Sequence, residues 1–185
     1  MPYRALVFDF FGVVCSEIAP PWFVEHRLGG EALKEKYVHP ADTGQETQEE
    51  LFDELGGLSG MRPEAIEAEW EGRARFDTAL LGAIEGWRKK CKTGLVTNAP
   101  SLFFRTLLAR IDGERYFDAI VVSSEIGHAK PEIYLAILEK LGVAPADALM
   151  IDDREENVAG ARAVGMAGHL FTSVTELKSL LAGHA

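Results

Sequence analysis

The feature that most constrains this chain is a set of short apolar runs that alternate with helical patterns. The runs are continuously apolar, as is typical of strands buried on both faces of a sheet. They occupy residues 4–10, 91–97, 117–123, 147–153 and 167–171. Helical patterns follow the second, third and fourth runs, over residues 101–111, 131–142 and 156–165. Because strand and helix alternate, we expect an α/β fold: an open, Rossmann-like parallel sheet flanked by helices and joined by right-handed crossovers.

The segment after the first run lacks this alternation. Apolar residues at Leu51 and Leu55, and at Ile66 and Trp70, have helical spacing, and Pro63 stands near the first turn of a second helical pattern. No strand-like run of comparable strength occurs before about residue 88. We therefore expect an α/β core of residues 1–14 and 86–185, with a small helical insert of residues 15–85 after the first strand.

Composition excludes several classes of protein. The 185 residues include 19 basic and 29 acidic side chains, giving a net charge of −10 without a long Lys/Arg cluster, so a nucleic acid is not expected as a partner. The N-terminus has neither the length nor the charge pattern of a signal peptide or a membrane span. The two cysteines, Cys15 and Cys91, are far apart, which favours a reduced, cytoplasmic setting. A small anionic ligand remains compatible with this charge, and the pattern leaves monomer or homodimer open.

Polar side chains stand where four of the expected strands end. In an open parallel sheet these carboxyl ends share one edge, and ligands bind there. The residues are Asp9, Thr97 with Asn98, Lys130 in the loop after the third strand, and the pair Asp152 and Asp153. Each alone is most often a turn former or a solvated surface group. Together they predict a site with a nucleophilic acid, a hydroxyl group, a cation and an acid pair.

The acid pair indicates the kind of ion that the site would take. Adjacent carboxylates such as Asp152 and Asp153 repel each other unless a cation or hydrogen bonds compensate. Mg²⁺ is a hard cation that proteins bind through one or two carboxylates, waters and substrate phosphates. The pair therefore favours Mg²⁺ together with a small phosphorylated substrate.

Four motifs resemble those of the haloacid dehalogenase superfamily of hydrolases, in the same order along the chain. They are VFDFFGVV, LVTNAP, GHAKPEIY and MIDDREENVAGARAVGM. The helical insert resembles the small cap of the subfamily with a helical cap, and TGQETQEELFDEL is similar to a cap segment of its sugar-phosphatase-like subgroup. The resemblance implies a phosphatase that hydrolyses a small phosphorylated metabolite, such as a sugar phosphate.

The resemblance also implies the role of each catalytic residue. Asp9 would attack phosphorus and become an aspartyl-phosphate. Thr97 would bind the phosphoryl oxygens beside the backbone of Asn98. Lys130 would neutralise the phosphate and orient Asp9.

The implied metal site is a Mg²⁺ site at the same edge. Asp9 and Asp153 would bind the ion directly, and Asp152 would assist directly or through water. A further ligand would be the backbone carbonyl of Phe11, a role that needs no particular side chain.

Phe11 departs from the pattern of most phosphatases in this family, which carry a second Asp there. That acid protonates the leaving oxygen and activates water, and such help is typically worth about 10²–10⁴-fold in rate. Three alternatives follow: a substrate with a good leaving group, an acid supplied by the insert such as Glu17 or His26, or a phosphate-binding protein with little turnover. His128, beside Lys130, is a further residue that could touch substrate.

A 2-haloacid dehalogenase is the other enzymatic alternative, because those enzymes also have an aromatic residue two positions after the nucleophile. In that reaction Asp9 would displace halide and no metal would be needed. Asp152 and Asp153 argue against it, because metal-free chemistry at carbon has no use for two adjacent acids. We therefore favour the Mg²⁺-dependent phosphatase.

Overall fold

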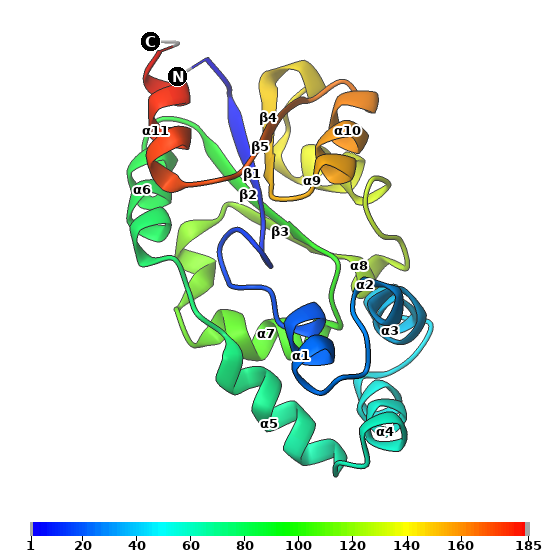
Figure 1. Cartoon of the computed structure of the whole chain (residues 1–185). Helices are drawn as coiled ribbons and strands as arrows, with labels where there is room; N and C mark the ends of the chain where they lie inside the picture. The colour runs from blue at the N-terminus through cyan, green and yellow to red at the C-terminus, as the bar shows by residue number, and fades with distance from the viewer. Residues whose placement is uncertain (1, 184–185) are drawn as a thin grey trace.

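The computed structural model describes residues 2–183 and contains one sheet of five strands (Figure 1). The strands are β1 (Ala5–Asp9), β2 (Lys92–Thr97), β3 (Ala119–Val122), β4 (Ala148–Asp152) and β5 (Ala167–Leu170). Their order is β3-β2-β1-β4-β5, and all four neighbouring pairs are parallel. The predicted open, Rossmann-like parallel sheet is confirmed, with its strands inside the five apolar runs.

The three central strands β1, β2 and β4 are buried on both faces, which explains why their runs are continuously apolar. In β1, Ala5 and Val7 belong to the core on one face, while Leu6 and Phe8 belong to the larger core on the other. Helices α9 (Ile133–Leu141) and α10 (Glu155–Ala163) contribute to the first core. The larger core receives α6 (Thr78–Arg88), α7 (Ser101–Ala109) and α11 (Val174–Ala182). These two groups of helices lie on opposite sides of the sheet in Figure 1.

The local signals for α9 differ in how well they locate its ends. Gly142 is the C-terminal cap with φ of 65°, a left-handed conformation that glycine adopts readily, so the helix stops where the sequence predicts. The helix begins at Ile133, two residues after Pro131, because residues 130–132 form a turn. Lys130 therefore lies in a turn at the sheet edge rather than directly before a helix.

Between β1 and β2 the described residues form helices and loops but no sheet strand. Besides α6, the helices are α1 (Ala19–Glu25), α2 (Glu31–Leu33), the π-helix η1 (Lys34–Val38), α3 (His39–Asp42), α4 (Gln48–Ser59) and α5 (Pro63–Arg73). Figure 1 shows α1–α5 gathered beyond the carboxyl ends of the strands. The short helices η2 (Gly113–Tyr116), α8 (Ser123–Ile126) and η3 (Pro145–Asp147) lie in later loops.

The paired helices α4 and α5 follow their sequence signals closely. Thr47 and Glu50 form a reciprocal capping box at the start of α4, and Pro63 opens α5. The residues with helical spacing, including Leu55 and Trp70, are buried and belong to the larger core.

Helix α6 crosses the predicted boundary between residues 85 and 86. It packs against the sheet, where the Trp87 ring stacks on Phe8 with centroids 6.2 Å apart. The division into core and insert remains a prediction, and we keep the name "insert" for α1–α5 and η1.

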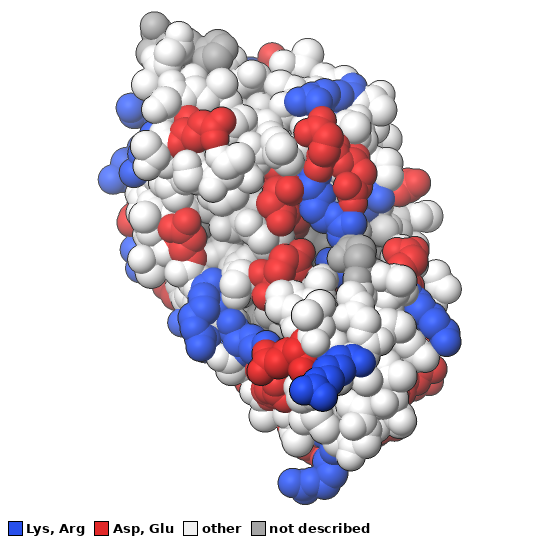
Figure 2. Space-filling model, in the orientation of Figure 1, with Lys and Arg blue, Asp and Glu red and all other residues white. Residues whose placement is uncertain are grey.

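Charge is mixed on the face that Figure 2 presents. Basic side chains lie among acidic ones there and do not form one continuous basic patch. Among residues 2–183, no helix combines the length and apolar character needed to cross a membrane.

Candidate active site

The carboxyl ends of β1 and β4 bring Asp9 and Asp152 to one lysine. Lys130 Nζ lies 2.7 Å from Asp9 Oδ2 and 2.8 Å from Asp152 Oδ2, and all three side chains are almost completely buried. The chain crosses from β3 on one side of β1 to β4 on the other, so this point is where the strand order reverses, the usual ligand-binding position in such sheets. The predicted cation therefore lies between two of the predicted acids.

The turn after β1 presents the Asp9 carboxyl group. The Phe10 N–H donates to Asp9 Oδ1 at 2.7 Å, and the Phe10 carbonyl accepts from the N–H groups of Val14 and Cys15. Burial raises the pKa of Asp9 well above its ordinary value, while the Lys130 ammonium and the Phe10 N–H act in the opposite direction. The turn thus orients Asp9 Oδ1, and Lys130 orients Asp9 Oδ2.

The Asp152 carboxylate has partners on both oxygens. Oδ1 accepts from Arg154 N and from Asn157 Nδ2, each at 3.0 Å, and Oδ2 lies against Lys130. Burial opposes ionisation, but the Lys130 ammonium and these hydrogen bonds together hold the pKa of Asp152 below its ordinary value. The Tyr134 hydroxyl donates to the Asn157 carbonyl at 3.0 Å and supports this arrangement from α9.

Asp153 differs from its neighbour, because its Oδ1 is buried and finds no hydrogen-bond partner among residues 2–183. Burial, followed by the neighbouring Asp152 and Glu17 carboxylates, raises the pKa of Asp153. A buried carboxylate oxygen without a donor is costly unless a ligand satisfies it. Asp153 is thus suited to bind a cation.

Asp9, Asp152 and Asp153 together fit a divalent metal ion. Each offers a carboxylate oxygen, and these atoms lie within 4.8 Å of one another. Gly12 makes this approach possible, since a Cβ there would lie 2.1 Å from Asp153 Oδ2 and the residue has φ of +84°. A set of hard oxygen donors at one point suits Mg²⁺. The role of the Phe11 carbonyl remains a prediction.

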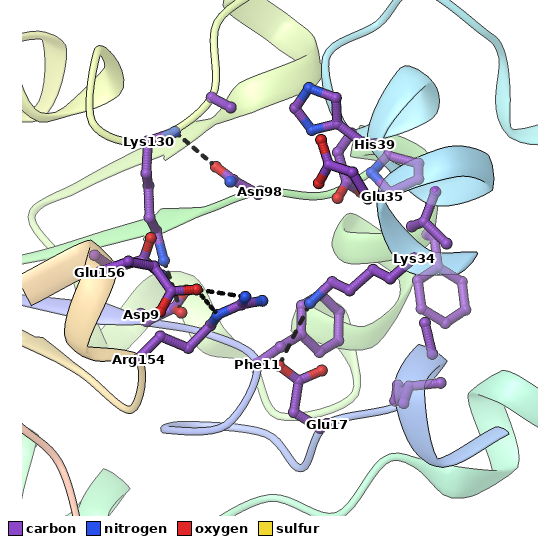
Figure 3. Close-up of a pocket in the computed structure, with 18 of the residues that line it drawn as sticks. Asp9, Phe11, Glu17, Lys34, Glu35, His39, Asn98, Lys130, Arg154 and Glu156 are labelled. Carbon is purple, nitrogen blue, oxygen red and sulfur yellow. Dashed lines mark hydrogen bonds and ion pairs between the residues drawn. The ribbon is translucent and has the colours of Figure 1, made fainter. Parts of the chain in front are cut away.

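Thr97 and Asn98, at the end of β2, lie in different environments. Thr97 is fully buried, and its Oγ1 finds no hydrogen-bond partner within the described part of the chain. The Asn98 side chain accepts a hydrogen bond from Lys130 N at 3.0 Å (Figure 3). Asn98 therefore holds the loop that carries Lys130, a side-chain function that its predicted backbone role did not include.

A pocket of about 320 Å³ opens between the sheet edge and the insert (Figure 3). Asp9, Asn98 and Lys130 line it from the sheet, whereas Thr97, Asp152 and Asp153 are not among its lining residues. Aromatic walls come from Phe11, Trp70 and Phe103.

Charged side chains complete the wall on the insert side and beside α10. They are Glu17, Lys34, Glu35, Asp42, Arg154 and Glu156. Lys34 Nζ reaches Glu17 Oε1 at 3.6 Å, and Arg154 Nε donates to Glu156 at 2.6 Å. Figure 3 shows the Lys34 side chain extending from the insert toward Glu17.

Sequence reasoning named Glu17 as a candidate from the insert but missed Lys34, Asp42 and most of the other wall residues. Nothing in the local pattern marks Asp42, which becomes part of the pocket only through packing. His26 is not among the lining residues, and its Nε2 lies 3.0 Å from Glu69 Oε1. His128 is exposed and is also absent from the pocket wall.

Two curated relatives are phosphatases. A phosphorylated carbohydrates phosphatase of Thermotoga maritima is 27% identical over 178 residues, which cover 88% of this chain and 82% of the relative. A phosphoglycolate phosphatase of Escherichia coli (strain K12) is 32% identical over 130 residues, which cover 68% of this chain but only 47% of the relative. The chain thus matches about half the length of the second relative. The two relatives act on different substrates by name.

A solved structure shares the fold. A HAD family enzyme of Bacteroides thetaiotaomicron, determined in complex with magnesium and inorganic phosphate, superposes with a TM-score of 0.78 at 22% identity, covering 95% of this chain and 98% of the other. Residues 3–165 match the haloacid dehalogenase-like hydrolase family itself, a span that contains the first three motifs and all but the last residue of the fourth. The family prediction is confirmed, and the chain belongs to the haloacid dehalogenase-like hydrolases.

Proposed function

We propose that this hydrolase is a Mg²⁺-dependent phosphatase that acts on a small phosphorylated metabolite through an aspartyl-phosphate on Asp9. One observation carries the proposal: the Asp9 carboxylate, the Lys130 ammonium and the Asp153 carboxylate lie together at one edge of the sheet. This arrangement combines a nucleophile, a fixed positive charge and an acceptor for a metal ion. The names of the two curated relatives support the same reaction.

The first step is the transfer of the phosphoryl group to Asp9. Asp9 attacks phosphorus in line with the leaving oxygen, and the bond from phosphorus to that oxygen breaks. Lys130 offers a positive charge to the phosphoryl oxygens, and the buried hydroxyl of Thr97 is able to donate to one of them. Mg²⁺ held by Asp9, Asp152, Asp153 and the Phe11 carbonyl would supply further neutralisation of the phosphoryl charge.

The second step is hydrolysis of the aspartyl-phosphate by water. Water attacks phosphorus, phosphate leaves and the Asp9 carboxylate is regenerated. The covalent intermediate divides one difficult hydrolysis into two easier steps, so a weakly basic carboxylate is sufficient as nucleophile.

The pocket favours a small polar substrate. Its volume of about 320 Å³ lies at the lower end of the range for small-molecule sites. Glu17 and Glu35 in its wall can accept hydrogen bonds from hydroxyl groups, and Lys34 can donate to them. Sugar phosphates are therefore the first substrate class to test, in agreement with the name of the Thermotoga maritima relative.

Phosphate release tests this proposal directly. Sugar, nucleotide and small organic phosphates are incubated with the protein with and without Mg²⁺, and Asp9→Asn serves as the control that keeps the side-chain shape. We expect Mg²⁺-dependent release that the variant abolishes. Full activity of Asp9→Asn would exclude the covalent mechanism.

The same preparation tests the alternatives that Phe11 leaves open. Release of halide from 2-chloropropionate without metal would identify a dehalogenase. Binding of Mg²⁺ and phosphate without turnover on any member of the panel would identify a phosphate-binding protein.

A further inference from the structure

The proposed reaction leaves one chemical role without a residue. The oxygen that leaves phosphorus needs a proton when it belongs to a basic alcohol, and Phe11 offers no acid at the position where the family resemblance implies one. Any replacement has to reach the pocket from another element. This inference rests on the phosphatase function proposed above and extends it.

Asp42 is a buried carboxyl group in the pocket wall. It ends helix α3, its exposed fraction is 4%, and it lines the pocket that also contains Asp9 and Lys130. Among residues 2–183, none forms a hydrogen bond or an ion pair with its carboxyl group. The group is therefore not committed to a structural contact and can meet a ligand.

Two contacts hold Asp42 against the sheet side of the pocket. The Ser123 hydroxyl, directly after β3, donates to the Asp42 carbonyl and accepts from Ala99 N at 2.9 Å. Gly44, two residues after Asp42, approaches the start of α8 so closely that a Cβ would lie 2.7 Å from the Ser124 carbonyl oxygen. Ser123 thus connects α3 of the insert to the loop that follows Thr97 and Asn98, and it fixes Asp42 relative to the phosphate site.

The surroundings of Asp42 favour a group that exchanges its proton near neutral pH. Burial raises the pKa of Asp42 to about 7, and the negative charges of Glu17 and Glu35 add to this effect. The positive charges of Lys34 and Lys130 act in the opposite direction. A pKa close to the working pH suits a residue that both gives and takes a proton in one cycle.

The other acids of the pocket wall are less suitable. Glu17 faces the Lys34 ammonium at 3.6 Å, so its carboxylate already has a cationic partner. Glu35 is exposed, and Glu156 is exposed and accepts from Arg154 Nε. Asp42 alone among these four is nine-tenths buried.

We propose that Asp42 is the general acid and base that replaces the side chain missing at Phe11. In the first step Asp9 forms a bond to phosphorus, the bond from phosphorus to the leaving oxygen breaks with its electron pair, and that oxygen takes the proton of Asp42. In the second step the Asp42 carboxylate takes a proton from water as the water oxygen attacks phosphorus. The bond between phosphorus and Asp9 then breaks, and free phosphate and the starting protonation state of Asp42 are restored.

A comparison of two aryl phosphates tests this role. 4-Nitrophenolate is a weakly basic leaving group that departs without a proton, whereas phenolate is more basic and benefits from one. For Asp42→Asn we expect kcat/KM on phenyl phosphate to fall about 10²-fold, and on 4-nitrophenyl phosphate to change by less than about tenfold. Asp53→Asn, an exposed acid of α4 outside the pocket wall, is the matched control and should change neither value.

The pH profile gives a second readout. Since the first step needs protonated Asp42, kcat/KM of the wild type on phenyl phosphate should fall as pH rises through about 7, and the Asn variant should lack this decline. Residual activity of the variant on 4-nitrophenyl phosphate shows that it is folded and binds phosphate.

The outcomes separate the two proposals. No Mg²⁺-dependent release from either ester by the wild type would contradict the phosphatase function itself. If the wild type is active, two results would refute the role of Asp42. In the first, Asp42→Asn melts like the wild type and loses activity on both esters equally. In the second, it loses activity on neither ester. If Asp42→Asn melts at a lower temperature than the wild type, Asp42→Ser takes its place, and its losses of activity on phenyl phosphate and on 4-nitrophenyl phosphate are compared in the same way. Selective loss on phenyl phosphate in Glu17→Gln instead would assign the acid to Glu17 and overturn the proposal.

Discussion

Replacing Lys130 by methionine should destabilise the folded protein strongly. The Lys130 side chain is 3% exposed, and its ammonium lies within 2.8 Å of two carboxylates that are themselves buried. Methionine keeps most of the length and volume but removes the charge, leaving Asp9 and Asp152 without a cation. Removing one partner of a buried ion pair costs about 3–5 kcal/mol. For a chain of this size that cost corresponds to a melting temperature lower by roughly 6–20 °C.

The size of this loss should depend on pH. In the wild type the pKa of Asp152 is lowered, so its pairing stabilises the fold above the unfolded-state pKa, and this contribution is lost as pH falls through the folded-state pKa. Without Lys130 the folded-state pKa values of both buried acids rise, and the variant loses stability as pH increases toward neutrality. The difference between wild type and variant should therefore be small near pH 4 and largest near pH 7.

Thermal melts of the metal-free proteins in EDTA from about pH 4 to 8 measure both effects. Lys178→Met is the matched control, because Lys178 is an exposed residue of α11. Exposed substitutions of this kind usually change stability by less than about 0.5 kcal/mol. A Lys130 variant as stable as the control at pH 7, or a deficit that does not change with pH, would refute the argument from the buried ion pair.

Two further substitutions test the phosphate and metal sites. Thr97→Val removes a fully buried hydroxyl that has no partner within the described residues. The rate of phosphate release should therefore fall about 10²-fold or more, while the melting temperature stays the same or rises. An unchanged rate would mean that the hydroxyl does not contact phosphate. Gly12→Ala places a methyl group 2.1 Å from Asp153 Oδ2, and displacement of this carboxylate should weaken Mg²⁺ binding about 10–100-fold in calorimetric titrations. Wild-type affinity in that variant would argue against Asp153 as a metal ligand.

The sheet was predictable because its signal is local. A strand buried on both faces has to be apolar at successive positions, and the segments around Phe8, Leu95 and Met150 meet this requirement within a few residues. Helix ends were less predictable, as the start of α9 at Ile133 shows. A proline permits a first turn but does not require one, and the packing of the preceding loop decides where the helix begins.

The sequence by itself determined the α/β architecture and the residues at the strand ends. The apolar runs and the motifs can be recognised because each consists of residues that are adjacent in the chain. That Asp9, Lys130 and Asp153 share one edge follows from parallel strands alone. The unpaired oxygen of Asp153 and the hydroxyl of Thr97, by contrast, were revealed only by burial.

Only the tertiary structure decided how the insert meets this edge. The contact between Ser123 and Asp42 joins residues 81 positions apart, and no local pattern reports such a distance. Asn157 and Lys34 likewise obtain their roles from the elements that pack around them. A side chain in a loop or a short helix takes its exposure and its charge environment from its neighbours in space, and these neighbours exist only after the chain has folded.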